Sequence, residues 1–281
     1  MNTDELMQVA LDLAGFAHIP EDSAVYVPGD DIQRVLFGLD IGTGELLLAR
    51  QAGYDAVIAH HPVGVPHRSW RVFARHVDLL VGAGVPEEAA RAAVAPRLET
   101  LRVDGQSRNY EQVPMAAERL GMPFLNVHCP LDEVGRRVMQ ETVDRLLAAN
   151  PAAMLGEVAA ALAALPAARR AETEVMVPLG DPAAPAGRVL VCHGAVTNGG
   201  AGVARACYAH GIATVVYIHI APGDLEMLRA DGRGQMVVVG HLVGDALGIE
   251  PYIAALRERG LEVDVLSRVL SRETGNVKRE T

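Results

Sequence analysis

Residues 54–62 read YDAVIAHHP, a short apolar segment that ends in two adjacent histidines. The β-branched Val57 and Ile58, with Gly53 before the segment and Pro62 at its end, predict a buried strand. In open parallel α/β sheets, ligands bind in the crevice beyond the carboxyl ends of the strands. The histidine pair is therefore placed where a chain of this class binds its ligand.

His60 and His61 are the candidate ligands at this strand end. Neutral imidazoles bind divalent metals. Consecutive strand residues point to opposite faces, so both side chains need partners of their own. A hydrogen-bonded core or loop histidine is the alternative interpretation of either residue. The pair alone does not decide between a metal site and this alternative.

The chain just before this strand has the pattern of a β-α-β unit. Residues 34–40, RVLFGLD, predict a buried strand, and residues 45–51 predict a helix that ends at Gly53. Both parallel strands would end at the same sheet edge, which brings Asp40 close to His60 as a hydrogen-bond partner for an imidazole nitrogen. A turn residue is the alternative role for Asp40.

A further strand is expected over residues 123–128, PFLNVH, with a helix over residues 133–147 after it. Asp132 lies between the two. It is a natural N-cap for the helix, and it also lies just beyond a strand end, as the histidine pair does. Both interpretations of Asp132 stay open from the residues alone.

The last third of the chain repeats the alternation of strands and helices. Strands are expected over residues 188–192, 212–220 and 235–239. Three strands of the chain would then end in histidine, at His60, His219 and His241, which favours a common site at the strand ends. His241 and Asp245 are four residues apart, so one helical turn could bring both to the same ion. An acid favoured by a helix dipole is the alternative for Asp245.

Charge and composition exclude several classes of function. A net charge of −10 without clusters of Lys or Arg argues against a nucleic-acid partner. Lys278 is the only lysine, which excludes Schiff-base chemistry, and the glycine-rich residues 194–202 lack a phosphate-loop pattern and predict a tight turn. Cys129, Cys192 and Cys207 are widely spaced and form no CxxC motif, so the sequence indicates neither a disulfide framework nor a structural zinc site. With no apolar run long enough for a bilayer, we expect a cytoplasmic protein with no membrane partner.

Four segments carry a resemblance to a known family: LDIGTGELLLARQAGYDAVIAHHP, NVHCPLD, VLVCHGAVTNGG and VVVGHLVGD. Their order and surroundings, from about Asp31 to Val263, resemble the NIF-three-like dinuclear-metal family, often labelled type 2 of GTP cyclohydrolase I. In that family the two adjacent histidines, the aspartate of the second segment, and the last histidine with the acid four residues later bind two metal ions. The resemblance implies that the metal ligands here are His60, His61, Asp132, His241 and Asp245.

Two positions depart from the family pattern. The final acid is usually glutamate, whereas Asp245 is one methylene shorter. Residues 219–224, HIAPGD, replace a segment that reads TGE followed by a histidine in the family, and His219 could compensate.

The resemblance also implies the architecture. We expect an α/β chain with the NIF-three-like fold, in which two lobes of mixed, largely parallel sheets hold a metal site between them at strand ends. The first lobe would comprise residues 1–127 and 235–281, and the second lobe residues 128–234. Family members of this type form toroidal hexamers, so the resemblance implies a homohexamer.

Three histidines and two carboxylates suit zinc, iron(II) or manganese better than calcium or magnesium. Five ligands over two ions leave open positions, and ions about 3.5 to 4 Å apart lower the pKa of water that they bind.

Our leading hypothesis is a metal-dependent hydrolase of a nucleotide-like or phosphorylated small molecule, of the GTP cyclohydrolase type by resemblance. The alternative is a non-catalytic role in metal storage, metal delivery or regulatory scaffolding. His128, His193 and His219 are candidates for an acid or base, and no catalytic residue is assigned.

Overall fold

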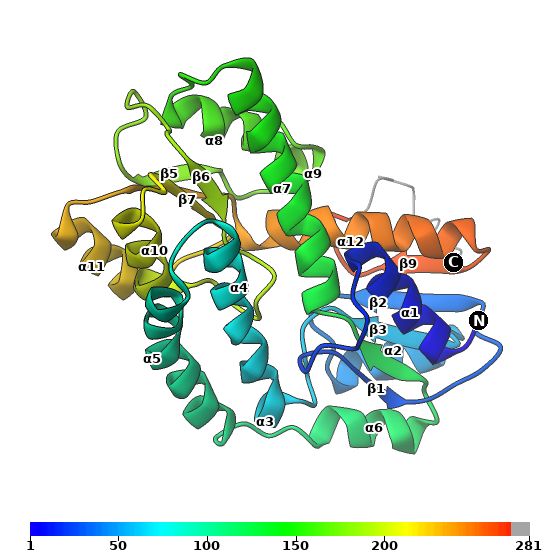
Figure 1. The fold of residues 1–281 in the computed structure, drawn as a ribbon. Helices are drawn as coiled ribbons and strands as arrows, with labels where there is room; N and C mark the ends of the chain where they lie inside the picture. The colour runs from blue at the N-terminus through cyan, green and yellow to red at the C-terminus, as the bar shows by residue number, and fades with distance from the viewer. Residues whose placement is uncertain (271–281) are drawn as a thin grey trace.

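Two mixed, largely parallel sheets organise the computed structural model, which describes residues 1–270 (Figure 1). The first sheet has five strands in the order β1-β4-β3-β2-β9, of which β1 alone is antiparallel to its neighbour. Its strands are β1 (Ala24–Val27), β2 (Arg34–Gly38), β3 (Ala56–Ala59), β4 (Phe124–Asn126) and β9 (Glu262–Val265). The strand predicted before the histidine pair is β3, and all of its residues are buried.

The second sheet has four strands in the order β5-β8-β7-β6, and β5 is antiparallel to β8. Its strands are β5 (Met176–Leu179), β6 (Val189–Val191), β7 (Thr214–Tyr217) and β8 (Gln235–Val238). The predicted class, α/β with two mixed and largely parallel sheets, is confirmed. The three strands predicted in the last third of the chain are β6, β7 and β8.

Helices connect and cover these strands. They are α1 (Thr3–Ala14), α2 (Thr43–Ala52), α3 (Pro66–Ser69), the 3-10 helix η1 (Trp70–Ala74), α4 (Arg75–Gly82), α5 (Glu87–Gly105), α6 (Gln112–Leu120), α7 (Cys129–Ala149), α8 (Leu155–Ala163), α9 (Pro166–Arg170), α10 (Gly200–Ala209), α11 (Pro222–Asp231) and α12 (His241–Glu258). The predicted β-α-β unit is β2-α2-β3, and Gly53 ends α2 with a left-handed φ of 75°. Over residues 1–270, no helix has both the length and the apolar composition that a bilayer crossing requires.

The chain passes from one sheet to the other at positions that differ from the predicted lobe boundaries. Residues 235–238, expected in the first lobe, form β8 and pair with β5 and β7 of the second sheet. The return to the first sheet comes later, through α12. Helices α4 and α5 also precede residue 128, yet they pack against α10 of the second sheet. Over residues 1–270, the predicted lobe boundaries therefore do not coincide with the division into two sheets, and the lobes themselves stay a prediction. Lys278 lies outside the described residues.

Helices α7 and α12 each lead from one sheet to the other, and they cross near the middle of the molecule (Figure 1). Glycines let their backbones touch: a Cβ on Gly248 would lie 1.8 Å from the carbonyl oxygen of Leu131, and one on Gly135 would lie 2.7 Å from that of Gly244. Only hydrogen atoms fit between the helices at this crossing. Any larger residue there would push α7 and α12 apart.

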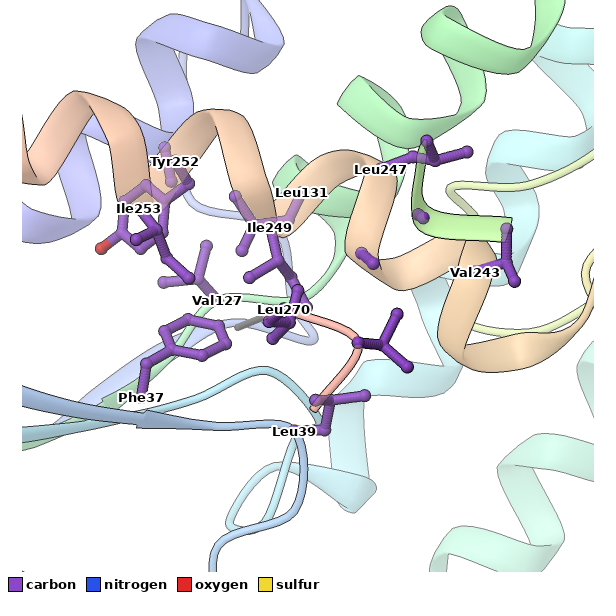
Figure 2. Packing of buried hydrophobic residues seen from close by; sticks show 14 of the residues in the cluster. Phe37, Leu39, Val127, Leu131, Val243, Leu247, Ile249, Tyr252, Ile253 and Leu270 are labelled. Carbon is purple, nitrogen blue, oxygen red and sulfur yellow. The ribbon is translucent and has the colours of Figure 1, made fainter. Parts of the chain in front are cut away.

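One face of α12 packs on the first sheet, as Figure 2 shows. Tyr252 and Ile253 lie over Phe37 of β2, and the rings of Tyr252 and Phe37 have centroids 6.3 Å apart. The same core cluster includes Val216 and Val237 of the second sheet. A continuous apolar core therefore fixes both sheets and the crossing helices relative to one another.

Candidate metal centre

Six histidines lie just beyond the carboxyl ends of strands from both sheets. They are His60 and His61 after β3, His128 after β4, His193 after β6, His219 after β7, and His241 after β8. All except His60 line one cavity of about 790 Å³. The strand ends of the two sheets therefore converge, as the histidines at three strand ends predicted.

Two members of this group, His128 and His193, were not predicted to join the site as ligands. Each follows an expected strand, at residues 123–128 and 188–192, as directly as the predicted ligands do. The position of both histidines at strand ends was therefore visible in the sequence. It did not predict a common site, because the sequence does not tell which strand ends of two separate sheets face each other.

Two buried aspartates complete the cluster, one from each crossing helix. Asp132 of α7 places Oδ1 3.2 Å from Nε2 of His60. Asp245 of α12 places Oδ2 3.3 Å from Nε2 of His61 and 3.2 Å from Nε2 of His241. The structure thus brings together all five residues that the resemblance implied as ligands.

The helical alternatives for the two aspartates do not hold. Helix α7 begins at Cys129 with His128 as its N-cap residue, so Asp132 lies inside the helix and not at its cap. Pro130 in the first turn allows this earlier start. Helix α12 begins at His241 and has no acid in its first turn, which removes the dipole explanation for Asp245. Both carboxylates instead point at imidazoles.

Several buried polar atoms in this cluster have no hydrogen-bond partner among the described residues. They are Nε2 of His60, His61 and His193, Oδ1 of Asp132, and Oδ2 of Asp245. Leaving a buried polar group unsatisfied costs about 1–3 kcal/mol, so five in one place require an explanation. Two ligand atoms that bind one tetrahedral metal ion lie about 3.4 Å apart. The distances between the imidazole nitrogens and the carboxylate oxygens given above, 3.2 to 3.3 Å, are close to this value. The donor set therefore fits a divalent metal.

The donor atoms form overlapping groups. His60, Asp132 and Asp245 make one group, His61, His241 and Asp245 make a second, and His60, His61 and His128 make a third. The atoms in each group lie within 4.8 Å of one another. Because Asp245 belongs to the first two groups, its two oxygens can face two different positions.

Three of the imidazoles are oriented by a hydrogen bond at Nδ1. His60 contacts the carbonyl oxygen of Val127 at 2.9 Å, His61 contacts Asp40 at 2.7 Å, and His128 contacts Asp22 at 2.7 Å. Each Nδ1–H donates to an oxygen, which leaves the lone pair on Nε2 to face the cluster. Asp40 is an imidazole partner as predicted, but its histidine is His61 and not His60.

The charges of the buried histidines and aspartates also fit a divalent metal site. Burial opposes charge on His60, but Asp245 and Asp132 outweigh burial and raise the pKa of His60 to about 10. Burial also opposes ionisation of the aspartates, yet the histidines hold the pKa of Asp132 and that of Asp245 below the usual value. Without an ion, protonated imidazole compensates two buried negative charges. A divalent cation can replace those protons, because metal binding releases protons from its ligands.

Searches against family models and curated proteins found no match. Among solved structures, the chain is similar to a NIF3 superfamily protein from Sphaerobacter thermophilus, with 47% identity, a TM-score of 0.92, and coverage of 95% of this chain and 98% of that one. Reduced HcgD from Methanocaldococcus jannaschii (13% identity, TM-score 0.58, 95% and 98% coverage) and TTHA1606 from Thermus thermophilus (15%, 0.54, 98% and 100%) share the fold.

Proposed function

We propose that this chain, which belongs to the NIF3 superfamily, binds two divalent metal ions through His60, His61, Asp132, His241 and Asp245. The observation that carries the proposal is the set of buried donor atoms without hydrogen-bond partners. An alternative network of protein hydrogen bonds would have satisfied them. Zinc, iron(II) or manganese suits this mixture of imidazole and carboxylate.

We assign the first ion to His60, Asp132 and Asp245, and the second ion to His61, His241 and Asp245. Asp245 would then contribute a ligand to each position. Three protein ligands on each ion would leave coordination positions open, which is the arrangement of catalytic rather than structural sites.

The reaction we propose is hydrolysis of a nucleotide-like or phosphorylated small molecule, of the GTP cyclohydrolase type by family resemblance. Metal ions held here would polarise a substrate oxygen and lower the pKa of water. The cavity of about 790 Å³ lies within the range of small-molecule sites. Trp70 and Arg97 line the cavity, where they offer an aromatic face and a positive charge to a ligand.

Turnover measurements separate this proposal from a metal carrier. Metal-loaded protein is tested on a panel of nucleotides and phosphorylated compounds, with His60→Ala as the inactive variant and His18→Ala as the control. His18 is exposed and lies outside the cluster. Turnover that His60→Ala abolishes and His18→Ala keeps supports the hydrolase. Rapid metal exchange without any turnover supports storage, delivery or a scaffold role instead.

Asp245→Ala is expected to lower the metal content by about one ion per chain or more, because Asp245 contributes to both groups of donors. Asp245→Glu is expected to keep the metal, since the longer side chain carries the same carboxylate. Elemental analysis of both variants tests this. Unchanged metal in Asp245→Ala would remove Asp245 from the ligand set.

The homohexamer is also a proposal that rests on the family. Light scattering is expected to give six times the chain mass of 29.8 kDa. A monomer mass at micromolar concentration would contradict the hexamer and would leave the metal proposal unaffected.

A further inference from the structure

His219 differs from the other oriented histidines in the partner of its Nδ1 atom. That atom lies 2.9 Å from Nδ2 of Asn198, in the loop before α10. The orientation of the Asn198 amide is fixed independently, because the backbone N–H of Gly200 donates to its Oδ1 at 2.9 Å. Oδ1 is therefore the oxygen, and the group that faces His219 is the amide NH2.

This contact determines where His219 carries its proton. An amide NH2 only donates, so Nδ1 of His219 must accept and cannot hold a hydrogen. The imidazole is then neutral, with its hydrogen on Nε2. His60 and His61 have the opposite tautomer, because their Nδ1 atoms face oxygens. Asn198 is buried, with 8% of its surface exposed, which holds the contact away from water.

His219 consequently offers a hydrogen-bond donor and no lone pair to the metal centre. It lines the same cavity as the metal cluster, and its ring centroid lies 5.0 Å from that of His241. Within residues 1–270, nothing accepts a hydrogen bond from its Nε2, and it forms no ion pair. A donor held in one orientation beside open metal positions is suited to a ligand oxygen.

Arg97 of α5 supplies a second donor group in this cavity. Burial is the main cause that lowers the pKa of His219, and the positive charge of Arg97 contributes to the same direction. The other arginine that lines the cavity, Arg108, is paired with Asp104 at 2.8 Å. Arg97 has no hydrogen bond or ion pair with any residue in the described part of the chain, so its guanidinium is free to bind an anion.

We propose that His219 and Arg97 bind the phosphoryl group of a small-molecule ligand at the metal centre. His219 Nε2–H donates to one oxygen, Arg97 donates to a second, and a third oxygen faces the metal ions. A tetrahedral oxyanion has enough oxygens for all three contacts, whereas a carboxylate has two. This inference rests on the proposed metal centre, and it makes His219 a ligand-positioning residue and not a sixth metal ligand.

Inorganic phosphate, titrated by calorimetry into zinc-loaded protein, tests the anion site. We expect saturable phosphate binding that weakens at least about tenfold in His219→Ala and in Arg97→Ala, since each loses a charge-assisted hydrogen bond. The zinc content of both variants should equal that of the unmodified chain. His18→Ala is the matched control for removal of a histidine and should bind phosphate normally.

The tautomer is tested by NMR on zinc-loaded protein labelled with 15N-histidine, with the His219 signals identified by their loss in His219→Ala. We expect a protonated Nε2 and an unprotonated Nδ1. Asn198→Asp should reverse this pattern, because a carboxylate accepts from Nδ1–H. That variant changes the tautomer while it keeps the shape of the side chain.

Each of the following results would overturn the inference: no phosphate binding by zinc-loaded protein, equal binding in His219→Ala or in Arg97→Ala, equally tight binding of acetate, or a His219 protonated at Nδ1. Loss of zinc in His219→Ala would also overturn it, by making His219 a metal ligand. A chain that binds no zinc refutes the metal centre itself along with this inference. Zinc binding without phosphate binding refutes the anion site alone.

Discussion

Replacing His60 and His61 together by alanine is expected to reduce the bound metal from about two ions per chain to a trace. Each proposed ion loses one imidazole, and the remaining Asp132, Asp245 and His241 supply at most two ligands to either position. Elemental analysis of protein purified without chelators measures the change. The result applies to a folded chain because the apolar residues of β3, which form the strand, are not altered.

The double variant should also unfold at a lower temperature than the metal-loaded parent. Asp132 and Asp245 are buried, and in the double variant they lose the metal and two of their neighbouring imidazoles, so that, within residues 1–270, only His128 and His193 stay beside Asp132 and only His241 beside Asp245. Removing one partner of a buried charged pair costs about 3–5 kcal/mol. Circular dichroism verifies that secondary structure is kept, and His18→Ala controls for the loss of a histidine. Only a trace of metal in the unmodified chain, or full metal in the double variant, would contradict the ligand assignment.

Gly248→Ala is expected to lower the free energy of unfolding by about 3 kcal/mol or more. The new Cβ would lie 1.8 Å from the carbonyl oxygen of Leu131, the closest such approach at any glycine among residues 1–270. Neither partner is the flexible end of a side chain, so α7 and α12 must move apart. That movement separates Asp132 from Asp245, and the metal content should fall as well.

Gly44→Ala is the matched control for this prediction. Gly44 lies in α2, and nothing lies within 4 Å of the position of an added Cβ. Alanine there should raise the free energy of unfolding by about 0.5–1 kcal/mol, because glycine is a poor helix former. Urea unfolding of both variants, with and without metal, gives the two values. Equal stability of Gly248→Ala and the parent would show that the helices are not in contact as described.

Local sequence patterns were enough to predict the β2-α2-β3 unit. Strand β3 is a short apolar run with β-branched residues, and Gly53 ends α2 in the left-handed conformation that glycine adopts without strain. These signals act over a few residues and depend little on distant packing. The family resemblance supplied the five ligand positions, and the structure brings all of them together.

The features that the sequence did not reveal depend on contacts between distant segments. Asp132 could be taken for an N-cap because the helix was expected from residue 133, whereas α7 begins at Cys129. Its place beside α12 is set by the glycine crossing between these two helices, which are far apart in the sequence. Residues 235–238 were expected beside the first sheet but pair in the second, because a buried strand reads the same in either sheet. The proton position of His219 depends on Asn198, a contact between two loops that no local pattern encodes.

The crossing of α7 and α12 constrains how this cavity can exchange its contents. Each helix joins the two sheets and carries one of the two aspartates, so the relative position of the sheets sets the distance between Asp132 and Asp245. A hinge motion that moved one sheet away from the other along these helices would separate the two carboxylates and break up any metal centre that they hold. Metal ions bound by both aspartates would therefore oppose such a motion and would hold the two sheets together.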